Sequence, residues 1–511
     1  MPASLLAAIP ALPALLLGFF LMQAGNTFQG TILSIRGEIE GFTLAEIGAV
    51  GAGFWAGVII GSLRAAALIR RVGHIRTFAA FGAIAGAAPL VHLLVVDPYV
   101  WIAARALTGF CFAGMFIVVE SWLNAGASSE NRGQVLSIYG MTGLLAGISG
   151  QLLLPATDPA SFRPFAIIAC IISLALVPIA LTQGAAPAPP GESSHVGLSR
   201  LYRDSPLGVA AGFLGGVTTG AFFTLGPIFA DERGLSTGQI AVFMACGTLG
   251  GFVAAWPLGL VSDRFDRRLV IIGAAAAAAA SLTAMLALVP GDAYPWLLYL
   301  CVALFGGMII PTYSLALAHL SDAVAQEEMG AASGGLLLAH GAGAAAGPLI
   351  AGFAMSATPR GLSYTLVAAQ ALIVLFGVSR LFLRAAPIAH KSAFALEPPV
   401  PVGTELAGAH STQPQRWALA AFVLEFMRET VPPRLLPLLW GRNKEGVALS
   451  CARREQRGIR CLAALRDPHP FPPTSGAGGP TTAARPQMQL ALSRQRALHR
   501  SDPHSQLLRT A

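Results

Sequence analysis

Long apolar runs recur along this chain, and they restrict its fold more than any other feature. Twelve runs of about 20 residues are each long enough for a helix to cross the roughly 30 Å hydrocarbon core of a bilayer. They lie at about residues 11–33, 44–68, 77–96, 99–122, 134–155, 164–182, 206–229, 238–261, 269–289, 294–319, 329–355 and 362–383. The sequence therefore predicts an all-α membrane protein with twelve transmembrane helices.

The composition agrees with this fold class and excludes several others. Apolar residues make up 54% of the 511 residues and charged residues only 11%, whereas soluble globular proteins carry about 25% charged residues. Such a chain is not an ordinary soluble enzyme, a disordered chain or a disulfide scaffold. No charged residue precedes Arg36, so the first run lacks the basic start of a cleavable signal and is interpreted as a retained span.

The runs form two groups of six, separated by a stretch rich in Pro, Ala, Gly, Ser and charge. We predict an N-terminal six-helix bundle over residues 1–183, a cytoplasmic linker over 184–204 and a C-terminal six-helix bundle over 205–385. Residues 386–511 account for the whole net charge of +8. They are predicted to be a basic, mostly disordered cytoplasmic tail, which either contacts anionic lipid or has no role of its own. A charge confined to a tail gives no reason to expect a nucleic-acid partner.

The two groups of runs resemble each other. A Ser/Thr-x-x-Glu/Gln capping box, which satisfies free amides at a helix start, begins at Thr43 and again 193 residues later at Ser236. Gly150 similarly returns 197 residues later as Gly347. These matches predict two pseudo-symmetric bundles, an arrangement that commonly places a transport site between them near the midplane.

Arginines in the short loops predict the orientation. With a cytoplasmic N-terminus, twelve arginines up to residue 385 fall at inner loops and helix ends and four at outer ones. Positive charge is enriched on the cytoplasmic side. We therefore expect a multi-pass protein of the bacterial inner membrane with both termini in the cytoplasm.

A motif before the ninth run resembles the signature Gly-x-x-x-Asp-Arg-x-Gly-Arg-Arg/Lys of the major facilitator superfamily. Its matching residues, which we call the gate motif, are Gly259, Asp263, Arg264, Arg267 and Arg268. Asp266 stands where the family has its second glycine, and the first-half copy at Gly61 has Ala65 in place of the aspartate. The resemblance implies a charged cytoplasmic gate in the second half, whereas simple positive-inside anchoring is the alternative.

The fourth run carries a second resemblance, over Arg105 to Gly109 and on through Glu120 to Gln134. This stretch is similar to the YcaD-like branch of the superfamily, whose substrates are not established. In proton-coupled members the arginine is linked to proton or substrate handling. From the residues alone, Arg105 either serves the cavity or reaches out to the membrane surface as an anchor.

The resemblance implies a cavity lined by the first, fourth, seventh and tenth spans. Gln23, Asn26 and Thr27 fall within roughly 100° on one helix face and are candidates to line it, although hydrogen bonding between helices is an alternative use of such amides. Further substrate candidates are Arg105, Tyr313 and His319. Pro311 predicts a kink beside Tyr313.

No Asp or Glu lies in the middle of any predicted span. If protons drive transport, Glu120, His319 or His340 must carry them; Glu120 and His340 are the coupling candidates, and a structural role for His340 is equally open. The glycines around His340 are expected to allow close helix packing.

These observations predict a secondary transporter that moves a small solute by alternating access, with an inclination towards a polar or anionic metabolite. A multidrug efflux antiporter and a membrane sensor on a transporter-like scaffold are the alternatives. No catalytic or phosphate-binding motif is present, so we expect no enzyme activity, no cofactor and no metal. The expected partners are the solute, protons and membrane lipids, and the expected state is a monomer. Substrate identity, direction and coupling ion are left open.

Overall fold

The computed structural model describes residues 11–128, 131–181, 187, 197–287, 295–325 and 328–383, apart from the side chains of residues 132 and 133. The predicted tail over 386–511, most of the linker over 184–204 and the motif residue Glu130 lie outside the described residues.

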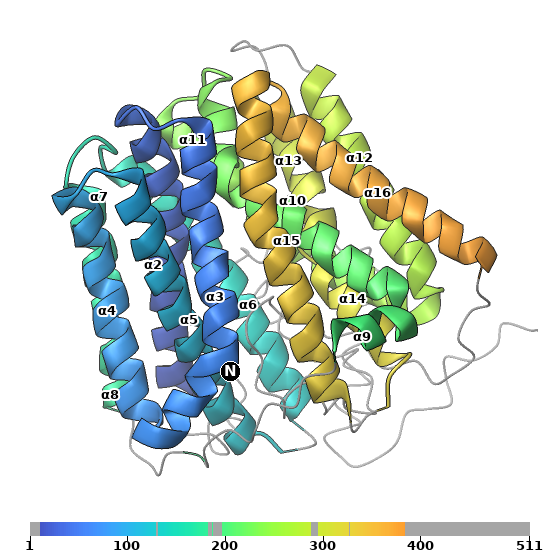
Figure 1. Ribbon diagram of the computed structural model, residues 1–511, viewed down its shortest axis with the longest axis horizontal. Coiled ribbons are helices and arrows are strands. Elements are labelled where there is room, and N and C mark those ends of the chain that lie inside the picture. The colour runs from blue at the N-terminus through green and yellow to red at the C-terminus, as the bar shows by residue number, and fades with distance from the viewer. Residues whose placement is uncertain are drawn as a thin grey trace, which may run out of the picture. The chain divides into compact units, whose positions relative to one another are not determined.

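The first half is a group of helices with short connections (Figure 1). In chain order its helices are α2 (Leu12–Ile39), α3 (Leu44–Val72), α4 (His74–Leu94), α5 (Pro98–Gly126), α6 (Arg132–Leu152), η1 (Leu154–Ala156), α7 (Arg163–Leu174) and α8 (Leu176–Ala180). The sixth predicted span is thus observed as two helices, α7 and α8.

The second half repeats this plan after a short helix, α9 (Leu198–Asp204), at the end of the predicted linker. Its helices are α10 (Pro206–Asp231), α11 (Thr237–Arg264), α12 (Arg267–Ala287), α13 (Pro295–Ile309), α14 (Thr312–Ser321), α15 (Met329–Ala357) and α16 (Gly361–Leu383). Arg200 of α9 forms an ion pair of 2.8 Å with Glu328, just before α15. The last helix of the linker therefore contacts the second half through this ion pair.

Eleven segments of the described chain are long and apolar enough to cross a membrane, judged by length and composition. The twelfth crossing is α2, which is long enough at 28 residues but less apolar because it contains Gln23, Asn26 and Gln29. Large apolar side chains such as Leu94, Phe353 and Phe382 are exposed on the outer helix surfaces. Exposed apolar surface of this kind is suited to contact with lipid. The predicted all-helical membrane fold is confirmed.

The tenth predicted span is broken in the middle, between α13 and α14. Ile310 and Pro311 separate the two helices, because proline has no N–H to continue the hydrogen-bond ladder. The Thr312 hydroxyl donates to the carbonyl oxygen of Met308 across the break, at 2.9 Å. The kink predicted from Pro311 is confirmed.

Equivalent residues of the two halves make equivalent contacts. The capping boxes at Thr43 and Ser236 are both formed, and each follows a glycine with positive φ, Gly41 at 80° and Gly234 at 79°. Such a backbone conformation favours glycine. The turns before α3 and α11 therefore share both the capping box and the positive-φ glycine, as the predicted internal duplication requires.

A pair of helix contacts repeats in the same way. A Cβ at Gly150 would collide with the carbonyl oxygen of Ala24, and one at Gly347 would collide with that of Val217. These contacts join α2 to α6 and α10 to α15, which are corresponding pairs of the two halves. Both glycines therefore serve close packing within a half.

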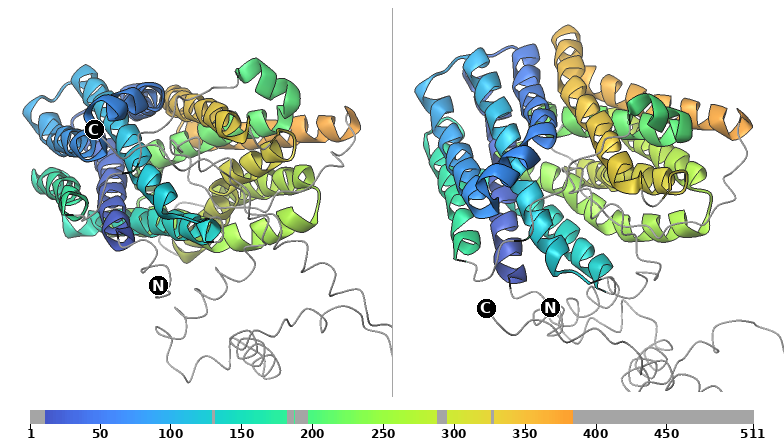
Figure 2. Two further views of the ribbon diagram at one scale, coloured as in Figure 1. Left: turned by 90° about the horizontal axis from the view of Figure 1, so that it is seen from below. Right: turned by 60° about the horizontal axis from the view of Figure 1, so that its bottom comes forward.

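The two halves meet through α2, α3 and α6 of the first half and α10, α11 and α15 of the second. Gly48 and Gly352 are packed against the backbones of Pro348 and Leu44, and the Ser34 hydroxyl donates to the Thr224 carbonyl at 2.6 Å. All these contacts lie at the end where α2 joins α3 and α10 joins α11. Towards the other end α3 and α15 diverge (Figure 1), and the view with that end brought forward shows the blue and the yellow-orange helices as separate groups (Figure 2).

Candidate functional site

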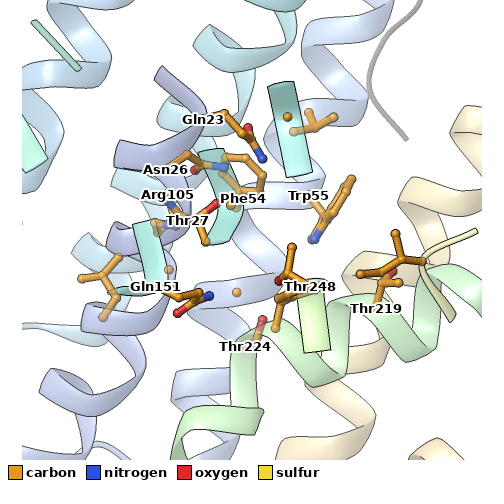
Figure 3. Close-up of a pocket in the computed structure, with 18 of the residues that line it drawn as sticks. Gln23, Asn26, Thr27, Phe54, Trp55, Arg105, Gln151, Thr219, Thr224 and Thr248 are labelled. Atoms are coloured by element: carbon orange, nitrogen blue, oxygen red, sulfur yellow. The ribbon is translucent and has the colours of Figure 1, made fainter. Parts of the chain in front are cut away.

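A cavity of about 260 Å³ lies between the two halves (Figure 3). Side chains from α2, α3, α5 and α6 of the first half and from α10, α11, α14 and α15 of the second line it. Its size is close to the lower limit for small-ligand sites, which is about 300 Å³. It therefore suits a small solute.

The polar stripe of α2 lines this cavity. Gln23, Asn26 and Thr27 all contribute, and Figure 3 shows them gathered on one side with Arg105. The side-chain carbonyl oxygens of Gln23 and Asn26 are buried and have no hydrogen-bond partner among the described residues. Buried polar atoms are nearly always paired in native proteins, so these two oxygens are free to accept hydrogen bonds from a ligand.

Arg105 lies in α5 and is only 6% exposed. Its Nη1 donates to Oε1 of Gln29 at 3.2 Å, and its guanidinium carbon lies 4.4 Å from the centre of the Phe54 ring. The sequence left two positions open for Arg105, in the cavity or extended to the membrane surface. In the structure its side chain is buried and lines the cavity. Within the described part of the chain it forms no ion pair with a carboxylate.

Gln29 is the partner of Arg105, which was not predicted from the sequence. Gln29 is completely buried and lies on the same helix as the polar stripe, outside the set that lines the cavity. Only packing of α2 against α5 reveals that this amide supports the guanidinium. A third amide in an apolar span was the one available signal.

Tyr313 and His340 line the cavity from the second half. Nδ1 of His340 lies 3.1 Å from the carbonyl oxygen of Gly212 and must donate to it, because a carbonyl only accepts. Nε2 of the neutral ring is then an acceptor, and it has no partner among the described residues. The His340 ring packs edge-on against Trp55 and Tyr313, with centroids 5.8 and 5.1 Å away.

Trp55 of α3 is a further lining residue that sequence reasoning missed. Figure 3 shows it across the cavity from the group formed by Arg105, Asn26 and Thr27. An aromatic residue in an apolar span gives no signal by itself, so its place in the site follows only from the packing of α3 against α15.

The structure places two of the predicted site residues outside the cavity lining. Glu120 is 1% exposed and accepts a hydrogen bond of 3.1 Å from the Tyr139 hydroxyl. His319 is 8% exposed near the end of α14, where two carboxylates, Asp322 and Asp266, and two guanidiniums, Arg267 and Arg268, act on it. Neither residue is brought together with Arg105.

The gate motif forms an ion-pair cluster at one end of the second half. Arg267, whose side chain is 1% exposed, bonds Asp322 at 2.7 Å and lies 3.8 Å from Asp263. Arg268 pairs with Asp266, the residue that replaces the glycine of the family motif, at 2.7 Å. These hydrogen bonds lower the pKa of the Asp266 carboxyl below its usual range. The cluster links the turn between α11 and α12 to the end of α14.

The remaining two residues of the gate motif form the helix end beside this cluster. Gly259 is buried in α11, and Arg264, the last residue of that helix, is exposed. Among the described residues, no group of three or more His, Cys, Asp or Glu side chains is arranged to hold a metal ion.

The family model described as Major Facilitator Superfamily matches this chain over residues 15–334 and again over 249–450. The chain belongs to this superfamily. It is similar to YcaD of Escherichia fergusonii, described as an uncharacterized MFS-type transporter, with 25% identity over 370 residues that cover 72% of this chain and 94% of the relative. An uncharacterized MFS-type transporter of Enterobacter sp. is 27% identical over 373 residues, with the same coverage.

Solved structures of the superfamily share the fold. The nucleoside transporter NupG superposes with a TM-score of 0.61 at 14% identity, covering 73% of this chain and 98% of its own. A bacterial homolog of the human lysosomal transporter Spinster gives 0.56 at 16% identity, covering 73% and 96%. The predicted resemblance to the superfamily and its YcaD-like members is confirmed, and the protein is a multi-pass membrane protein of a transport family.

Proposed function

We propose that this chain is a secondary transporter of the bacterial inner membrane that moves a small polar solute by alternating access. Both termini would face the cytoplasm, and the protein would act as a monomer without enzyme activity. The solute would bind in the cavity between the halves. Each half would then move largely as a rigid body around the bound solute.

The observation that carries this proposal is a cavity with free polar atoms between two duplicated halves that meet at one end. With the arginine-rich loops in the cytoplasm, the end held together by Ser34, Thr224 and the glycines of α3 and α15 faces the outside. In the alternate state these contacts must separate. Small residues allow two helix surfaces to come close and part again without interlocking side chains.

The proposal includes two residues as candidate proton carriers, His340 and Glu120. His340 lines the cavity and contacts Trp55 of the first half and Gly212 of the second. A change in its protonation would therefore affect both the binding of the solute and the contact between the halves. Glu120 is buried beside Tyr139, away from the cavity. Each is a candidate to carry a proton because histidine and buried carboxylates exchange protons during transport cycles.

Blocking the closed end tests the mechanism. A leucine at Gly48 would collide with the Pro348 backbone, so Gly48→Leu should hold the outer end open and abolish uptake or counterflow in proteoliposomes. Gly273→Leu, on an exposed face of α12 with nothing within 4 Å, is the matched control and should keep wild-type transport. The assay measures counterflow of a panel of radiolabelled organic anions, nucleosides, sugars and cationic dyes.

The location of the block is read independently of activity. A cysteine placed at Gly30, which lines the cavity one turn from Ser34 and has open space around it, should react with an outside thiol reagent faster in the Gly48→Leu background than in wild type. Normal transport by Gly48→Leu, with unchanged reactivity at residue 30, contradicts alternating access through this end.

A further inference from the structure

We infer that the solute is a small planar aromatic anion that also carries a hydrogen-bond donor. This inference rests on the proposed transport function and specifies the chemical class of its cargo. Three properties of the cavity carry it: an uncompensated positive charge, free acceptor atoms and an aromatic wall.

The positive charge is that of Arg105. Its partners are the neutral amide of Gln29 and the ring of Phe54, and the described part of the chain contributes no Asp or Glu to the cavity lining. A buried charge is costly unless an opposite charge compensates it. A guanidinium offers paired donors that match a carboxylate, so an anionic group on the ligand would complete the site.

The free acceptors lie beside and opposite this charge. The side-chain oxygens of Gln23 and Asn26 and the Nε2 atom of His340 are buried, have no partner among the described residues and belong to cavity-lining side chains. A ligand made only of acceptor atoms would leave all three unsatisfied. An N–H or O–H group on the ligand would pair with at least one of them.

The aromatic wall sets the shape. Trp55, Tyr313 and the His340 ring form an edge-to-face cluster on the side of the cavity where Figure 3 shows Trp55, away from Arg105. Aromatic side chains favour contact with planar rings. A volume of about 260 Å³ limits the ligand to one or two rings. The anion would therefore point to Arg105 and the ring to Trp55.

This arrangement disfavours cationic amphiphiles. Among the described residues, no carboxylate lines the cavity to balance a cation, and the charge of Arg105 would repel a cation. It also disfavours aliphatic acids, which would satisfy Arg105 but leave the aromatic wall without a planar partner.

The test is direct binding to the purified full-length protein, measured by calorimetry with matched probes. Para-hydroxybenzoate should bind, whereas its amide, para-hydroxybenzamide, its cationic counterpart para-hydroxybenzylamine, and cyclohexanecarboxylate should each bind about 10- to 100-fold more weakly. Arg105→Gln should lower affinity for para-hydroxybenzoate by a similar factor and leave affinity for the neutral amide unchanged. Arg76→Gln, an exposed arginine of α4, is the control and should bind both as wild type does.

Gln29 is tested as a positioning residue. Gln29→Leu removes the hydrogen bond that Arg105 makes to Gln29 and should weaken para-hydroxybenzoate binding less than Arg105→Gln does. Gln29→Glu should weaken binding more than Gln29→Leu, because a carboxylate would compete with the ligand for Arg105. Equal effects of all three variants, together with a lowered melting temperature, would mean that Gln29 acts only in folding.

The outcomes separate this inference from the transport function. Binding of para-hydroxybenzylamine or cationic dyes in preference to para-hydroxybenzoate, with counterflow of those cations, overturns the cargo class but keeps the transporter. Tight binding of para-hydroxybenzoate with no counterflow of any probe keeps the ligand class but overturns transport and favours a sensor.

Discussion

The arginine that lines the cavity and the arginines of the gate motif lie at different depths, one in the first half and the others in the second. The first half holds Arg105 within a span, beside the cavity, with only an amide and a ring as partners. The second half holds Arg267 at a helix end, paired with Asp322 and Asp263. The backbone plan is duplicated, but the charge is not.

The same contrast is visible where the gate motif is copied. At the first-half copy of the motif, Ala65 of α3 stands where the second half has Asp263, and it is completely buried. Ala65 packs against Gly114 of α5, so an apolar contact occupies this position of the first half. Apolar pairs can replace ion pairs without loss of stability. The first half therefore keeps its helix packing at this position without the carboxylate that the second half carries.

Breaking the ion pair between Arg267 and Asp322 in the second half should have the largest effect on stability. Arg267→Leu leaves the Asp322 carboxylate without its closest partner and should lower the free energy of unfolding by about 3–5 kcal/mol. The double variant with Asp322→Leu should recover most of that loss. Denaturation in mixed micelles measures the free energy of unfolding of the single and the double variant.

Arg264→Leu is the control for this cycle, because Arg264 is exposed at the end of α11. It should change stability by less than about 0.5 kcal/mol. Strictly additive losses in the double variant would show that Arg267 and Asp322 are not coupled.

The duplication itself is tested by Gly150→Ala and Gly347→Ala. In each case the added methyl group meets a backbone carbonyl oxygen, of Ala24 or Val217, so both variants should lose about 1–3 kcal/mol of stability. Thermal unfolding in detergent compares them. The exposed Gly273→Ala should instead gain up to about 1 kcal/mol from helix propensity. A loss in one variant alone would mean that the two contacts are not equivalent.

The smallest expected effect is the acid response of the second half. The Arg268 guanidinium depresses the pKa of Asp266 by hydrogen bonding, so the stabilisation is present above the carboxyl's ordinary pKa, about 4, and is lost as the pH falls through the depressed value. Solvent screening limits it to about 1 kcal/mol or less.

Asp266→Asn keeps an acceptor for the Arg268 amide but removes the charge. Its melting temperature should lie below that of wild type near neutral pH, and the two values should converge below about pH 4. A difference that stays constant across this range would rule out the carboxylate charge as the cause.

Much of the fold could be predicted from the sequence, because a bilayer leaves few choices. Hydrocarbon forces every backbone amide into internal hydrogen bonds, so a run of about 20 apolar residues specifies a helix without knowledge of its neighbours. The capping boxes at Thr43 and Ser236 and the break at Pro311 are equally local and were predicted. The helix at the end of the linker, α9, was missed because its packing depends on a distant partner, Glu328.

For the candidate site, helical periodicity was enough to predict the stripe of Gln23, Asn26 and Thr27, since it puts these residues on one face. The packing of the helices was needed to show that Gln29 supports Arg105 and that Trp55 joins the cavity. It also places His319 and Glu120 outside the cavity lining. Periodicity fixes a side chain's direction from its own helix axis. The neighbour it meets depends on the crossing of helices far apart in sequence, which is set by close contacts such as Gly48 with Pro348.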